Sequence, residues 1–167
     1  VREIQLSVLA SGDFDRSYLE GDNSTTVPTD TIKNTIYALA KDRFTGAIEE
    51  FAAALADHFL GKYPAISRLV IEIEEKPWAR FTVDGQPHPH SFQRGAGGIR
   101  WSKLEADRER KEFTSGVQEL EILKSTGSGF VGFPRCDFTT LPEVTDRILA
   151  TKVSAEWHFS SPPKSFD

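Results

Sequence analysis

Apolar and polar residues alternate at the start of the chain, most clearly over Ile4–Val8. A period of two is typical of a strand with one buried face, so this segment predicts a half-buried strand. We expect the strand to resume after Ser11-Gly12 and to continue through Phe14 and Tyr18.

Two helices are expected next, from about Asp30 to about Lys41 and from Thr45 to Gly61. Glycine is a common residue at a helix end, which supports the second boundary. The second segment also carries a stripe of apolar residues at helical spacing, which indicates a helix that packs on a sheet. The residues of this stripe are Ile48, Phe51, Leu55 and Phe59.

The rest of the chain predicts mainly strands, with a polar, turn-rich stretch at 84–90 and a glycine-rich tip at 94–98. Thr140-Leu141-Pro142-Glu143 matches a capping box and predicts a short helix to about Ala150. The order of elements favours an α+β fold with helices on one face of an antiparallel sheet. The expected strands are Leu69–Glu75, Trp78–Val83, Ile99–Ala106, Val117–Leu123 and Val153–Phe159.

Composition narrows the functional classes. The net charge is -5 with interspersed signs, which disfavours binding to nucleic acid through a basic face. No apolar run approaches the length of a membrane span, so no membrane association is expected. The single cysteine, Cys136, cannot form an internal disulfide; it indicates a reducing compartment such as the cytoplasm, and a buried or inert thiol is expected. The chain contains no Met and begins at Val1, which leads us to expect an incomplete chain.

The segment from Val27 to Tyr37 holds the first candidate for chemistry. Pro28 is followed by Thr29 and Asp30 where a helix should begin. A hydroxyl, a carboxylate and unpaired backbone N–H groups then share one positively polarised helix end, which could hold an anionic small molecule. An ordinary capped helix explains the same local pattern.

A glycine-rich loop and an arginine form the second candidate. Residues 127–132 contain a formal GxGxxG, but no helix is expected directly after the loop, as a dinucleotide site would require. Phe130 beside these glycines could instead stack on a planar ring. Arg147 could hold a planar anion through two parallel hydrogen bonds, or form a surface ion pair with Asp146 or Glu143.

His88-Pro89-His90 is the only pattern that suggests a metal. Two imidazoles without further spaced ligands do not make a recognised metal site, so these residues are expected to be turn histidines and no metal is predicted.

Four segments, spread over nearly the whole chain, resemble the urate oxidase (uricase) family. They are SYLEGDNSTTVPTDTIKNTIY, DGQPHPHSF, LKSTGSGFVGFPRCDFTTLPEVTDRILAT and AEWHF. The resemblance implies a tunnelling fold (T-fold), with two similar domains of antiparallel sheet and helices per subunit and a homotetramer with active sites at subunit interfaces. Residues 1–112 would be the first T-fold domain without its first strand. Residues 113–167 would be the opening hairpin and short helix of the second.

The resemblance also implies cofactor-free oxidation of urate by dioxygen to 5-hydroxyisourate and hydrogen peroxide. Thr29 matches the catalytic threonine, and Asp30 matches the neighbour whose backbone N–H contacts the purine. Phe130 matches the residue that stacks on urate, and Arg147 matches the arginine that binds its carbonyl and ring nitrogen. Thr29 is therefore expected to lie closer to Phe130 and Arg147 of a neighbouring subunit than to its own.

The chain departs from the family pattern in one important respect. A family lysine that serves the threonine has no match here, and Lys33 is not its equivalent. The chain alone is therefore expected to be incomplete for catalysis. Another purine- or pterin-handling T-fold enzyme and an inactive assembly module remain as alternatives, and a peroxisomal location applies if the source is eukaryotic.

Overall fold

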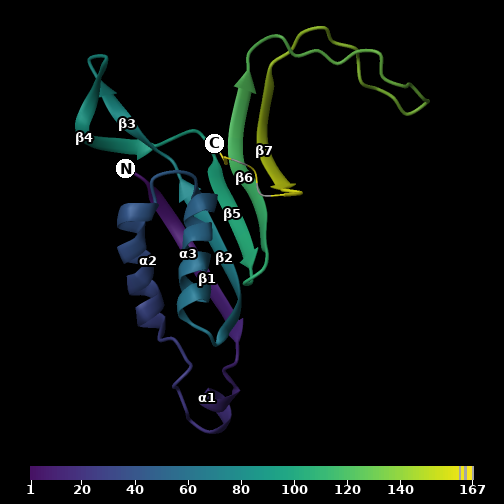
Figure 1. Ribbon diagram of the computed structural model, residues 1–167. Helices are drawn as coiled ribbons and strands as arrows, with labels where there is room; N and C mark the ends of the chain where they lie inside the picture. Colours follow the sequence, from purple (N-terminus) through teal and green to yellow (C-terminus); the bar gives the residue numbers. More distant parts are fainter. Residues whose placement is uncertain (162, 164, 167) are drawn as a thin grey trace.

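Five antiparallel strands form the main sheet of the computed structural model, which describes residues 1–161, 163, 165 and 166. Their order is β1-β2-β5-β6-β7, and β3 and β4 form a separate two-stranded sheet (Figure 1). No helix among the described residues is long and apolar enough to cross a bilayer. The elements are β1 (Glu3–Gly12), α1 (Asp15–Leu19), α2 (Thr29–Arg43), α3 (Ile48–Lys62), β2 (Ile66–Lys76), β3 (Trp78–Val83), β4 (Gln86–Arg94), β5 (Ile99–Ala106), β6 (Lys111–Lys124) and β7 (Leu149–His158).

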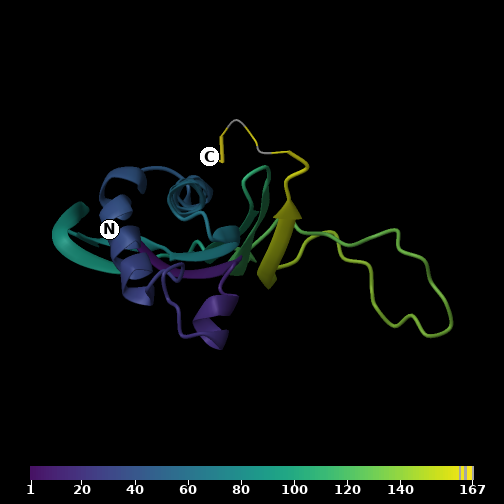
Figure 2. The same ribbon diagram turned by 60° about the horizontal axis from the view of Figure 1, so that its bottom comes forward.

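The core lies between α3 and the central strands. The predicted apolar stripe of α3 is fully buried or nearly so, and it packs with alternate residues of β2 and with Leu104 and Phe113. Helix α2 covers β1 on the same side of the sheet but contains no fully buried residue (Figure 2). The prediction of an α+β fold with helices on one face of an antiparallel sheet is thus confirmed.

The prediction that the first strand continues through Phe14 and Tyr18 is wrong, because the chain leaves the sheet at Gly12 and forms α1. The backbone of Ala65 lies so close to Gly12 that a Cβ atom there would come within 1.9 Å of the Ala65 carbonyl oxygen. Only glycine fits this approach, and the register of β1 with β2 shifts at the same point.

The stretch 84–90 is a hairpin rather than an extended turn. Asp84 and Gly85 both have positive φ, at 52° and 74°, and Val83 pairs with Gln86, so the turn itself has two residues. Positive φ at both positions favours an Asp-Gly turn whose twist matches the flanking strands. The segment His88–His90 therefore lies in β4 and not in the turn, which corrects the prediction of turn histidines.

The helix predicted from Thr140 to about Ala150 does not form; the chain is irregular until β7 begins at Leu149. The side chain of Glu143 accepts a hydrogen bond from the Gly132 N–H at 3.1 Å instead of capping a local turn. Val144 pairs with Phe130 through two backbone hydrogen bonds of 2.8 and 3.2 Å. Glu143 and the Val144 backbone thus find their hydrogen-bond partners in residues 130–132 of the same chain and not in a local helical turn.

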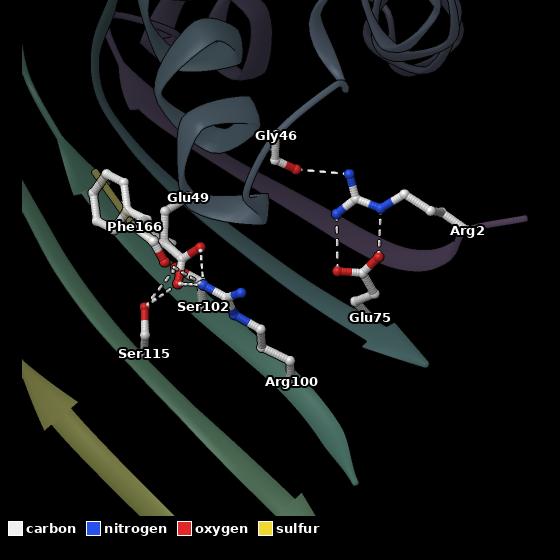
Figure 3. Close-up of polar contacts among 8 residues, drawn as sticks. All are labelled: Arg2, Gly46, Glu49, Glu75, Arg100, Ser102, Ser115 and Phe166. Carbon is white, nitrogen blue, oxygen red and sulfur yellow. Dashed lines mark hydrogen bonds and ion pairs between the residues drawn. The ribbon is translucent and has the colours of Figure 1, made fainter. Parts of the chain in front are cut away.

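A buried carboxylate is the main polar feature of the core (Figure 3). Glu49, at the start of α3, is 0% exposed and accepts a hydrogen bond from Ser115 at 2.7 Å. It also pairs with Arg100 at 3.1 Å, and the Arg100 side chain is 39% exposed. Arg100 in turn donates to the Phe166 carbonyl at 3.0 Å, so one guanidinium links α3, β5 and the chain's last segment. The sequence pattern gave no sign that Glu49 is buried.

Candidate active site

Thr29 is the first residue of α2, directly after an extended Pro28. Pro28 is the N-cap residue and makes no side-chain cap hydrogen bond. The Ile32 N–H donates to the Pro28 carbonyl at 3.1 Å and closes the first turn. Thr29 and Asp30 are both exposed, so the predicted helix start exists and presents its first N–H groups to the surface.

The Asp30 carboxylate is engaged within its own helix. It pairs with Lys33 at 2.8 Å and accepts a hydrogen bond from Asn34 at 2.8 Å. Both partners lie further along α2, so the side chain is directed along the helix. A ligand at the helix start would therefore meet the Asp30 backbone N–H rather than a free carboxylate.

A groove of about 670 Å³ separates α2 from β1, and Thr29 lies in its lining. The floor is apolar and includes Ile4, Leu6 and Val8. Arg2 lines one end, but its guanidinium is already engaged: it forms an ion pair with Glu75 at 2.6 Å and donates to the Gly46 carbonyl at 2.6 Å (Figure 3). The groove is thus lined mainly by residues of β1 and α2.

The second half of the candidate site lies on the β6–β7 arm, which we define as residues 125–148. The Thr126 hydroxyl donates to Asp146 at 2.7 Å, and the Gly127 N–H does so at 2.7 Å. These hydrogen bonds, with one from the Ser128 N–H, hold the pKa of Asp146 below its ordinary value. The ionised carboxylate thus ties the two sides of the arm together near its base.

Phe130 and Arg147 lie close together on this arm. The Arg147 guanidinium carbon is 5.9 Å from the centroid of the Phe130 ring, and Phe130 as a residue is 44% exposed. In the part of the chain that the structure describes, Arg147 forms no ion pair with Asp146 or Glu143; both carboxylates accept hydrogen bonds from the opposite side of the arm. A stacking ring and an exposed guanidinium therefore occur side by side.

The two halves of the candidate site are far apart within one chain. Helix α2 covers β1 at one edge of the sheet, while the arm leaves the sheet at the opposite edge, between β6 and β7. Four strand spacings separate these edges, which amounts to about 19 Å. Figures 1 and 2 both show the arm extending further away from α2. One chain does not bring Thr29 to Phe130 and Arg147.

The described residues contain no group of three or more His, Cys, Asp or Glu side chains that could hold a metal ion. His88 and His90 have ring centroids 6.5 Å apart, and the His88 Nδ1 accepts the His90 backbone N–H. Cys136 is exposed, so of the expected buried or inert thiol the buried state is wrong, and an inert thiol stays a prediction. The Thr139 hydroxyl beside it lowers the pKa of the Cys136 thiol.

One aromatic residue on the arm escaped the sequence analysis. Phe133 stacks on Phe130 with ring centroids 4.8 Å apart and an angle of 10° between the planes. The sequence signal that could have revealed it is a glycine, Gly132, between the two phenylalanines. In the structure Gly132 has a φ of 72°, which lets the chain bend between the two rings.

An antiparallel sheet with two helices on one face, and a phenyl ring and guanidinium that lie side by side but far from Thr29, are the features of an α+β protein of the tunnelling-fold class. The family model described as Uricase matches residues 1–103 and 113–167, so the chain belongs to the uricase family.

Relatives with curated names support this assignment. The uricase of Cyberlindnera jadinii is 48% identical over 158 residues, which cover 94% of this chain and 52% of that protein. The uricase of Schizosaccharomyces pombe is 45% identical over an alignment that covers 100% of this chain and 55% of that protein. The chain therefore spans about half the length of the curated relatives it matches.

Solved structures give the same result. The crystal structure of the uricase from Arthrobacter globiformis is similar with a TM-score of 0.70 and 38% sequence identity. The similarity covers 96% of this chain and 54% of that one. The fold expected from the sequence is thus shown both by the chain's own geometry and by its similarity to uricase structures.

Proposed function

We propose that the protein to which this chain belongs is a urate oxidase. The observation that carries the proposal is the uricase family match, which extends over both the helix-bearing part and the β6–β7 arm. The activity belongs to the whole protein, since the relatives are about twice as long as this chain. We propose that this chain alone is incomplete for catalysis.

The proposed reaction is a two-electron oxidation. Urate loses two electrons from its ring, dioxygen takes them up with two protons as hydrogen peroxide, and a water molecule supplies the hydroxyl at C5 of 5-hydroxyisourate. We propose that no cofactor takes part. The protein's contribution is then to orient the ring, to stabilise its anion and to move protons.

Phe130 and Arg147 would bind the substrate. The exposed face of the Phe130 ring suits a planar purine, and Arg147 lies close enough to reach the edge of a stacked ring. A guanidinium can donate two parallel hydrogen bonds to a carbonyl oxygen and a ring nitrogen of the urate anion.

Thr29 and Asp30 would act above the ring and at its edge. The Asp30 N–H at the start of α2 is available to a purine acceptor, while the Asp30 side chain is bound to Lys33. The Thr29 hydroxyl would relay protons and help to hold dioxygen or water. A hydroxyl needs a partner for this task, and Lys33 is occupied by Asp30.

We propose that the site is completed between subunits of a homotetramer. The opposite positions of α2 and the β6–β7 arm support this, because a second chain is needed to bring Thr29 close to Phe130 and Arg147. The division into domains at 1–112 and 113–167 remains part of the proposal, with Phe113 near the start of β6 as the boundary. The cytoplasm, or the peroxisome of a eukaryote, remains the proposed location.

The test is turnover by the intact gene product. With urate we expect uptake of dissolved oxygen and release of hydrogen peroxide in equal amounts, and the rate should survive dialysis against a chelator. Oxidation of a pterin but not of urate would favour the other T-fold enzyme. Binding of neither compound would favour an inactive assembly module, and either result would overturn the proposal.

A further inference from the structure

Two stacked phenyl rings on the β6–β7 arm each have a guanidinium nearby. The Phe130 and Phe133 rings are nearly parallel, 10° apart in orientation and 4.8 Å between centroids. The Arg147 guanidinium carbon lies 5.9 Å from the Phe130 centroid. The Arg135 guanidinium carbon lies 5.2 Å from the Phe133 centroid. Phe133 therefore has an aromatic neighbour, Phe130, and a cationic neighbour, Arg135.

The backbone of the arm builds this stack. Phe130 is fixed by its paired backbone hydrogen bonds with Val144. Two residues later, Gly132 adopts a φ of 72° and donates its N–H to Glu143. This bend brings Phe133 back over Phe130, three residues away in sequence. The contact depends on a glycine conformation that other residues rarely adopt.

A phenyl ring has two faces, and Phe133 covers one face of Phe130. Phe133 itself is only partly exposed, while Phe130 keeps 44% of its surface accessible. A planar ligand can therefore stack on Phe130 only from the side that Phe133 leaves open. The stacked pair also restricts rotation of the Phe130 ring before any ligand arrives.

We propose that Phe133 is a positioning residue for purine binding: it fixes the plane of the Phe130 ring and leaves one face for the substrate. This inference rests on the proposed function, because it assigns a support to the urate-stacking ring. Phe133 acts through Phe130 and does not itself touch the substrate.

The test compares Phe133→Leu with Phe133→Tyr in the intact protein. Leucine keeps the apolar volume but cannot stack, so we expect KM for urate to rise about two- to twelvefold, the range of an aromatic pair. Because stacking stabilises bound substrate and transition state alike, kcat should change little. Phe133→Tyr should restore the wild-type KM. Phe138→Leu is the matched control, since Phe138 is 90% exposed on the same arm, and it should change nothing.

A double-variant cycle makes the assignment specific. If Phe133 acts through Phe130, Phe133→Leu should have no further effect on KM in a Phe130→Leu background. The aromatic NMR signals of Phe130 should also lose their ring-current shift in Phe133→Leu but not in Phe138→Leu, with or without urate.

The outcomes separate this inference from the proposed function. Wild-type turnover of urate with an unchanged KM in Phe133→Leu would overturn the inference alone. So would a loss of kcat and thermal stability that tyrosine does not rescue, since that pattern indicates a merely structural role. A wild-type protein that does not oxidise urate would overturn both.

Discussion

Replacing Arg147 with alanine in the intact protein should lower kcat/KM for urate roughly 100-fold, because hydrogen bonds from a charged group to a buried anion contribute about 3 kcal/mol together. Arg147 is not held by a carboxylate within the described chain, so its side chain is available for the substrate. The arm should stay intact, since its hydrogen bonds use Asp146, Glu143 and backbone groups. Steady-state oxygen uptake measures the effect.

Two further variants define what the loss means. Arg147→Lys keeps the charge but not the paired donors, so it should recover only a small part of the activity. Lys152→Ala removes a cation on neighbouring β7 whose ion pair with Glu121 is exposed, and it should leave kcat/KM unchanged. Equal losses in Arg147→Ala and Lys152→Ala would show that Arg147 has no specific role.

Arg100→Ala should destabilise the fold by about 3 kcal/mol, the lower end of the range for breaking a buried ion pair. The variant removes the Arg100 cation from the fully buried Glu49 carboxylate, and Ser115 is then its remaining side-chain donor among the described residues. We choose the lower end because the exposed part of Arg100 lets water reach the space that it vacates. The midpoint of thermal unfolding at one fixed protein concentration reports the change.

The control for this variant is Arg110→Ala. Arg110 pairs with Glu112 in a highly exposed ion pair, whose loss should cost at most about 1 kcal/mol. Adding Glu49→Gln to Arg100→Ala should restore part of the lost stability, because the buried charge is then gone. An Arg100→Ala midpoint equal to that of Arg110→Ala would contradict this account of the core.

The sequence pattern predicted the core because apolar periodicity reports burial directly. The stripe of α3 and the strands β2 and β5 follow from it, whereas β7 forms as the alternation predicted but contains no buried residue. The start of α2 at Thr29 was also predicted within one residue, since proline is common at the start of a helix and Pro28 is the N-cap here. Apolar periodicity did not predict the burial of Glu49, because its partners Ser115 and Arg100 lie far from it in sequence.

The β6–β7 arm was predicted least well. The capping-box residues Thr140 and Glu143 have the right spacing for a helix, but hydrogen bonds across the arm compete with it. The proximity of Phe130 and Arg147 depends on that same pairing and could not be derived from spacing. The resemblance to uricases predicted that Phe130 and Arg147 share a site, whereas the stacking of Phe133 was found only in the structure.

We propose that one urate pocket combines Thr29 of one subunit with Phe130 and Arg147 of another. Co-expression of Thr29→Val and Arg147→Ala chains tests it, with each variant also prepared alone. In a symmetric pair, a mixed assembly has one site with both defects and one site with none. Random pairing in equal amounts should therefore restore about a quarter of the wild-type rate of urate oxidation, although each variant alone is nearly inactive. A mixture no more active than the separate variants would contradict the shared pocket.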